Sequence, residues 1–116
     1  MPSSSFLVQA GATPRGAGLR LQGCCTATPE AARLLQGVQR LLTAGAEVVW
    51  VDCQALEPLT WQGQRALLQA DRLVHAAGGQ AFWCGLSPAV EQQLRASGLY
   101  GLLRVLPAAG YQGPRW

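Results

Sequence analysis

Lysine, asparagine and isoleucine are absent from this chain of 116 residues, and there is a single histidine, His75. The three absent residues use AT-rich codons, which suggests a GC-rich genome rather than a function. The nine basic residues other than His75 are all arginines, they are spread along the chain without a cluster, and the net charge is only +3. Because a nucleic-acid interface needs a basic stripe or patch, we expect no nucleic-acid partner.

Long apolar runs are also missing. No segment approaches the roughly 18 consecutive apolar residues that a membrane-spanning helix needs, so we expect no membrane span. Residues 1–5 carry no basic segment and no apolar stretch follows them, so we expect no secretory signal and a cytoplasmic protein. With 49% apolar and 13% charged residues, the composition is that of one folded domain rather than a disordered segment.

The four cysteines, Cys24, Cys25, Cys53 and Cys84, form no Cys-x-x-Cys pair. Zinc and redox sites need ligands at closer spacing, so we expect free thiols, mostly buried, and no metal. The six acids and His75 suggest no set of nucleophile, base and orienting group, so we expect no enzyme activity. No glycine-rich phosphate loop is visible and no cofactor is expected, although ligand sensing in a cleft stays open.

The stretch from Glu47 to Ala77 organises the rest of the chain. Val48–Val51 is a continuous apolar run, typical of a central strand covered on both faces, and Asp52 follows it. A connection over 53–60 leads to a helix that begins at Trp61. Partners of open α/β sheets meet the chain where a strand ends and the next helix begins, and a helix start presents free N–H groups. We therefore place any function first at this helix start.

The other elements follow from periodicity and from turn residues. Strands are expected over 6–10 and 19–22 as a hairpin around a turn at 11–18, and again over 81–84 and 102–106. Helices are expected over 28–44, 61–77 and 88–97, with Ser87 and Thr28 as N-terminal caps and Gly45 and Gly98 after two of the ends.

The order of these elements predicts an α/β fold, in which a mixed β-sheet packs against three or four α-helices in a single domain. We divide the chain into an N-terminal segment with the first strand (1–18), a core (19–106) and a tail (107–116). The tail is either loose or docked on the domain.

Four side chains receive a purely structural interpretation. Trp50 and Trp83 lie in predicted strands and are expected in the core. Asp71 and His75 fall largely outside the apolar stripe of the second helix, so His75 is expected to be an isolated surface residue near a helix end.

Three segments of the chain carry the pattern of a known family. The first segment is 23–26 (Gly-Cys-Cys-Thr), which follows the second strand. The second consists of 52–53 (Asp-Cys), at the end of a strand, and 60–63 (Thr-Trp-Gln-Gly), which open the next helix. The third consists of 87–90 (Ser-Pro-Ala-Val) and 97–99 (Ser-Gly-Leu), at the two ends of the last helix. They resemble the STAS domain, the family of anti-sigma-factor antagonists. Its members carry Gly-Glu-Leu-Asp, Asp-Leu, Asp-Ser-Ser-Gly and the same last two motifs at these places. The last segment matches in letters, and the middle one matches in spacing.

The resemblance covers about 19–106 and implies a bacterial regulator that works by binding another protein. In the family, a kinase that is also the anti-sigma factor phosphorylates the serine before the helix-start glycine, and the added charge breaks the complex. That position is Gln62 here, which cannot take a phosphate in this chemistry, and the two family acids near it are replaced by Thr26 and Thr60. The resemblance therefore implies a binding module without the usual switch.

The helix start and the neighbouring loop are the expected partner-binding residues: Thr60, Trp61, Gln62, Gly63, Arg65, Cys24, Cys25 and Thr26. Trp61 is either an anchor for the partner or a lid over the core. Thr60 is expected to cap the helix, with a role as alternative phosphoacceptor left open. Arg65, one turn on, is either solvated or meets an acidic partner.

Two functions follow from the resemblance. The first is an adaptor that binds an anti-sigma kinase or another STAS protein. The alternative is an accessory subunit that binds the ATPase of a lipid-trafficking ABC transporter, a role that needs no phosphoserine and so suits Gln62.

Overall fold

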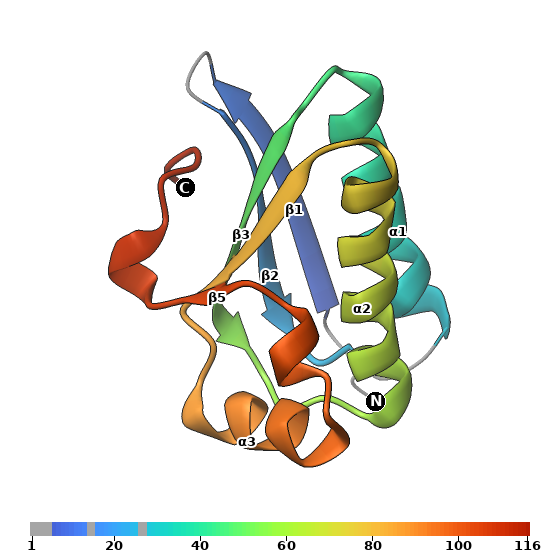
Figure 1. The fold of residues 1–116 in the computed structure, drawn as a ribbon, viewed down its shortest axis with the longest axis vertical. Coiled ribbons are helices and arrows are strands. Elements are labelled where there is room, and N and C mark those ends of the chain that lie inside the picture. The colour runs from blue at the N-terminus through green and yellow to red at the C-terminus, as the bar shows by residue number, and fades with distance from the viewer. Residues whose placement is uncertain (1–5, 14–15, 26–27) are drawn as a thin grey trace.

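The computed structural model describes residues 6–13, 16–25 and 28–116 (Figure 1). Thr26, one of the expected partner-binding residues, lies outside these described residues. Their helices and strands, in chain order, are β1 (Phe6–Thr13), β2 (Gly16–Gly23), α1 (Thr28–Thr43), β3 (Val48–Leu56), α2 (Trp61–Ala76), β4 (Gln80–Cys84), α3 (Pro88–Ser97), the 3₁₀ turn η1 (Tyr100–Leu102), β5 (Val105–Leu106) and the 3₁₀ turn η2 (Ala108–Gly110).

The strands form one mixed sheet in the order β1-β2-β3-β4-β5, in which β1 is antiparallel to β2 and the other neighbours are parallel. Parallel neighbours need a crossover connection, and α1, α2 and α3 provide the three crossovers. Helices α1 and α2 lie side by side on one face of the sheet, while the C-terminal segment runs past the opposite face (Figure 1). The predicted α/β architecture is confirmed.

The main core lies between the sheet and the α1–α2 layer. Alternate residues of β3 point into it, and Val49 and Val51 are fully buried there. Leu34 of α1 and Leu67 of α2 are equally buried, as their apolar stripes predict. This packing holds the first residues of α2 in place beside the end of the sheet.

The caps predicted for the last helix are confirmed, whereas Thr28, expected to cap the first helix, is itself the first residue of α1. Ser87 accepts a hydrogen bond at 3.3 Å from the backbone N–H of Val90 and begins α3, and Gly98 ends it with a φ of 83°. Gly45, with a φ of 94°, follows α1. None of the helices in the described ranges has the length and apolar character needed to cross a bilayer.

The predicted extents of several strands are wrong. Residues 11–18 were expected to form a turn, but β1 and β2 extend through most of them because the antiparallel ladder pairs Gly11 with Gly18. The strand expected to end at Val51 continues to Leu56 because it keeps pairing with β2. The strand expected over 102–106 is reduced to two residues because η1 takes its beginning. In each case long-range pairing or packing overrides local propensity.

Three side-chain placements also differ from expectation. Trp50 lies half-buried on the face opposite the helices, stacked on Phe82 with ring centroids 4.6 Å apart. Asp71 is only 3% exposed and accepts a hydrogen bond at 3.1 Å from Nε1 of the buried Trp83. His75 is not isolated, because its Nε2 lies 3.4 Å from Oδ2 of Asp71. A buried indole N–H needs an acceptor, and this need draws Asp71 inward.

The C-terminal tail docks on the face of the sheet that α1 and α2 leave open. Pro114 is buried over Gly18, and the Tyr111 hydroxyl donates a hydrogen bond to the Pro114 carbonyl at 2.7 Å. A Cβ added at Gly18 would lie 2.7 Å from Cδ of Pro114 and 2.7 Å from the Tyr111 hydroxyl. The absence of a side chain at this strand position therefore lets the tail approach the sheet.

Replacing Gly18 by alanine is expected to displace the tail while the domain stays folded, because the added methyl group occupies the place of Pro114. The measurement is the rate of chymotrypsin cleavage after Tyr111, which should rise. Gly101→Ala is the matched control, because a Cβ there meets nothing within 4 Å. An unchanged cleavage rate in the Gly18 variant would contradict the docked tail.

Candidate functional site

The start of α2 is built around Thr60. Its hydroxyl oxygen accepts a hydrogen bond from the backbone N–H of Gly63 at 3.2 Å, so the predicted cap is confirmed. The same hydroxyl donates to the Cys25 carbonyl at 3.5 Å. Thr60 thus joins the helix start to the segment that follows β2.

Gly63 brings these two segments into direct contact. It is buried, and a Cβ at this position would overlap the Cys25 carbonyl oxygen. The structure therefore gathers residues 60–65 and 24–25, all of them expected partner-binding residues except Gln64, at one corner of the molecule. We call these residues the α2 corner.

Trp61 and Gln62 both point away from the core. Trp61 is 64% exposed, so the interpretation of its ring as a lid on the core is wrong. The Arg65 guanidinium carbon lies 5.7 Å from the centroid of the Trp61 ring, a cation–π distance. Gln62, between them on the first turn, is exposed as well. The corner therefore presents a large aromatic ring, a cation and a neutral amide to solvent.

The electrostatics of the corner favour an acidic partner. The first turn of α2 contains no acid, so its free N–H groups and the positive end of the helix dipole are not neutralised from within the turn. Arg65 adds a full positive charge on the same side. Glu57 is exposed nearby and accepts a hydrogen bond from the Cys24 thiol at 3.3 Å.

The cysteines of the corner are weak nucleophiles. The hydrogen bond to Glu57 raises the pKa of Cys24, and burial raises the pKa of Cys25 to about 11. Both thiols are therefore protonated near neutral pH, whereas the thiolate is the reactive form. In the described part of the chain, no group of three or more histidine, cysteine or acidic side chains is arranged to hold a metal ion.

Gln93, on α3, is a residue of this site that the sequence pattern did not indicate. Its Nε2 donates to the Leu59 carbonyl at 2.7 Å, and its Oε1 accepts from the Leu59 N–H at 2.7 Å. Both ends of the amide thus hold the loop before Thr60. The contact joins residues 34 apart in the chain, so no local periodicity could reveal it.

Gln93→Ala is expected to lower the free energy of unfolding by about 1–3 kcal/mol, because the buried Leu59 backbone loses both partners. Hydrogen exchange at the Leu59 amide should accelerate. Gln92→Ala, at the neighbouring exposed position, is the control. It should leave the free energy of unfolding and the exchange rate at Leu59 unchanged. Unaltered protection of Leu59 in Gln93→Ala would show that another group holds the loop.

The fold is that of the anti-sigma factor antagonists, the STAS fold, as the sequence motifs predict. An anti-sigma factor antagonist from Mycobacterium paratuberculosis matches with a TM-score of 0.73 at 16% identity, over 88% of this chain and 86% of that chain. The anti-sigma factor antagonist SpoIIAA in its unphosphorylated form matches with a TM-score of 0.68 at 19% identity, over 85% and 87%. The Bacillus cell fate determinant SpoIIAA in its phosphorylated form matches with a TM-score of 0.61 at 17% identity, over 87% and 90%. No family model and no curated protein matches the chain.

Proposed function

We propose that this protein is a non-catalytic regulatory module that binds another protein through the α2 corner and lacks the phosphorylatable serine. The fold of the anti-sigma factor antagonists supports the general class. The partner that suits this class is an anti-sigma factor with a kinase-like fold, or another protein of the same fold. The protonated thiols of Cys24 and Cys25 supply no nucleophile, which suits a binding role.

The exposure of Trp61 is the observation that carries the proposal. An indole ring that is 64% exposed leaves much apolar area in water, and burying such area against a partner is favourable. Tryptophan and arginine are also the residues most enriched among interface hot spots, and Arg65 lies beside this ring. A partner with an apolar recess ringed by acids would complement both groups.

The regulation of such a complex must differ from phosphorylation at the corner. Gln62 occupies the place of the family serine, and its amide offers no hydroxyl to a kinase. Thr60 has a hydroxyl, but that group is engaged with Gly63 and Cys25. We infer that the chain stays competent to bind and that control lies in the partner.

Photo-crosslinking tests the proposal directly. The photoreactive residue p-benzoylphenylalanine is placed at position 62 in the native host, and the captured proteins are identified by mass spectrometry. The control carries the same residue at position 92, which is exposed on α3. The expected result is a kinase-like anti-sigma factor, or a protein with the STAS fold, captured from position 62 alone. Capture of a transporter ATPase, or of no protein at all, would overturn the proposal.

Phosphorylation of the chain gives a second prediction. With ATP and the kinase recovered by crosslinking, the wild-type protein should gain no phosphate, as measured by intact mass. Gln62→Ser should gain one and lose affinity, because a phosphate brings about −1.5 to −2 charges to the interface. A phosphate found on Thr60 of the wild-type protein would contradict the proposed loss of the switch.

A further inference from the structure

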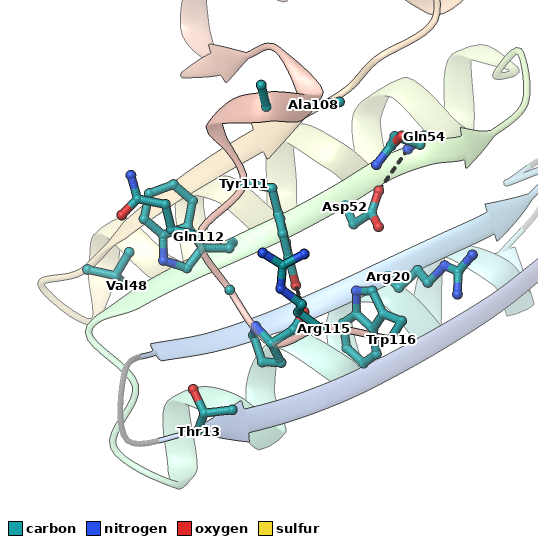
Figure 2. A pocket seen from close by; sticks show the side chains of 14 residues that line it. Thr13, Arg20, Val48, Asp52, Gln54, Ala108, Tyr111, Gln112, Arg115 and Trp116 are labelled. Carbon is teal, nitrogen blue, oxygen red and sulfur yellow. Dashed lines mark hydrogen bonds between the residues drawn. The ribbon is translucent and has the colours of Figure 1, made fainter.

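A groove lies between the docked tail and the open face of the sheet, away from the α2 corner (Figure 2). Its volume is about 1110 Å³, and its lining comes from β1, β2, β3 and residues 108, 109 and 111–116. Charged, amide and aromatic side chains line this space together. The proposed function makes no use of any of them.

Asp52 lies at the floor of the groove on β3 and is only 9% exposed. Its Oδ1 accepts a hydrogen bond from the Gln54 backbone N–H at 3.0 Å. Among the described residues, this is the one hydrogen bond to the carboxylate, and no cation lies within ion-pair distance of it. A carboxylate buried to this degree is normally paired or bonded on both oxygens. Oδ2 therefore remains available to a donor that enters the groove.

Arg20 is the cross-strand neighbour of Asp52, on β2, and it lines the same groove. Adjacent strands lie roughly 4.8 Å apart, so the two side chains start close together. They nevertheless form no ion pair, and within the described chain Arg20 has no other acidic partner. One acid, Asp52, and two bases, Arg20 and Arg115, thus line one groove, and no ion pair joins them among the described residues. Such a groove can receive both charges of a small zwitterion.

Aromatic rings form the rest of the wall. Tyr111 and Trp116 come from the tail (Figure 2). Trp50, two residues before Asp52 on β3, also lines the groove, while its ring stacks on Phe82. Burial raises the pKa of Tyr111 to about 12, so its ring is neutral under ordinary conditions. These rings offer apolar and stacking contacts to an aromatic ligand.

We propose that this groove binds a free aromatic α-amino acid. Its ammonium group donates to Oδ2 of Asp52, its carboxylate accepts from the Arg20 guanidinium, and its ring packs on Tyr111 and Trp116 of the tail. Asp52 and Arg20 are paired neighbours on adjacent strands, so one small ligand can reach both groups. A ligand with an ammonium group alone would meet the positive charges of Arg20 and Arg115, and one with a carboxylate alone would leave Oδ2 of Asp52 without a donor.

The test is titration of the full chain with L-phenylalanine, followed in ¹H–¹⁵N spectra. The indole N–H signals of Trp50 and Trp116 and the amide of Gln54 should shift saturably, while the indole of Trp61 should not. Two matched probes each lack one charge: phenethylamine has no carboxylate, and 3-phenylpropionate has no amine. Each should bind at least about tenfold more weakly than L-phenylalanine.

Variants distinguish specific binding of L-phenylalanine in this groove from a general affinity of the protein for aromatic compounds. Asp52→Asn retains the acceptor for Gln54 but removes the charge, and Arg20→Gln removes the opposite charge; each should weaken L-phenylalanine at least about tenfold. Arg72→Gln, an exposed change on α2, is the control and should leave binding unchanged. Equal binding of the three probes, equal binding by Asp52→Asn, or the absence of saturable shifts would each overturn the proposal. Since the α2 corner lies elsewhere, these outcomes are independent of partner binding.

Discussion

Trp61→Ala is expected to weaken binding of the crosslinked partner by about 2–4 kcal/mol, roughly 30-fold to 700-fold in Kd. The indole ring is the largest apolar group at the α2 corner, and its 64% exposure leaves most of it available to the partner. Removing it also takes away the ring over which the Arg65 guanidinium lies. Arg65→Ala should therefore have a smaller effect, and the double variant should lose less than the sum of the two.

The melting temperature separates this result from a loss of folding. Because so little of Trp61 packs on the core, Trp61→Ala should leave the melting temperature nearly unchanged. Leu102→Ala is the control, since Leu102 is 57% exposed but lies on η1. A Leu102 variant that weakens binding as much as Trp61→Ala would place the interface elsewhere, and so would a Trp61 variant with unchanged Kd.

Gly63→Ala is expected to lower the free energy of unfolding by about 3 kcal/mol, since a Cβ at this position would overlap the Cys25 carbonyl oxygen. Helix propensity alone predicts the opposite sign, because alanine stabilises a helix interior by about 1 kcal/mol relative to glycine. The obstacle is backbone on a buried segment, so no side-chain rotation relieves it. To accommodate the methyl group, α2 must move away from the segment after β2.

Chemical denaturation of Gly63→Ala and Gly101→Ala measures this effect. Gly101 has open space around its missing Cβ, so its variant should remain within about 0.5 kcal/mol of the wild type. A Gly63 variant that is more stable than the wild type would contradict the contact between α2 and Cys25. Partner binding by the folded fraction should also fall, because that contact orders the α2 corner.

The features that the sequence predicted correctly depend on contacts between residues that are only a few positions apart. Ser87, Gly98 and Thr60 bound their helices as expected, because a cap bonds to an N–H or a carbonyl only a few residues away. The STAS-like fold was predictable as well, since the motifs at 87–90 and 97–99 keep both letters and spacing. The position of the α2 corner followed from the order of strand, connection and helix.

Contacts between distant parts of the chain were not predictable. The periodicity of α2 predicted Asp71 at the surface. In the structure it is buried, because the indole N–H of Trp83, on a strand, needs an acceptor. Gln93 looked like an ordinary helix residue, yet its amide holds Leu59 across 34 residues. Whether Trp61 covers the core or lies exposed depends on contacts across the domain, which no local pattern specifies.

The sequence by itself determined the helices, their caps, the order of the elements and the absence of a serine at Gln62, because these depend on residue identity and short-range spacing. Only the tertiary structure decided that the tail covers one face of the sheet. It also decided that Asp52 and Arg20 are neighbours on adjacent strands beneath the tail and form no ion pair. The physical reason is that strand register and tail docking are set by contacts across the whole domain. A residue's burial and its partners therefore emerge only when the sheet is assembled.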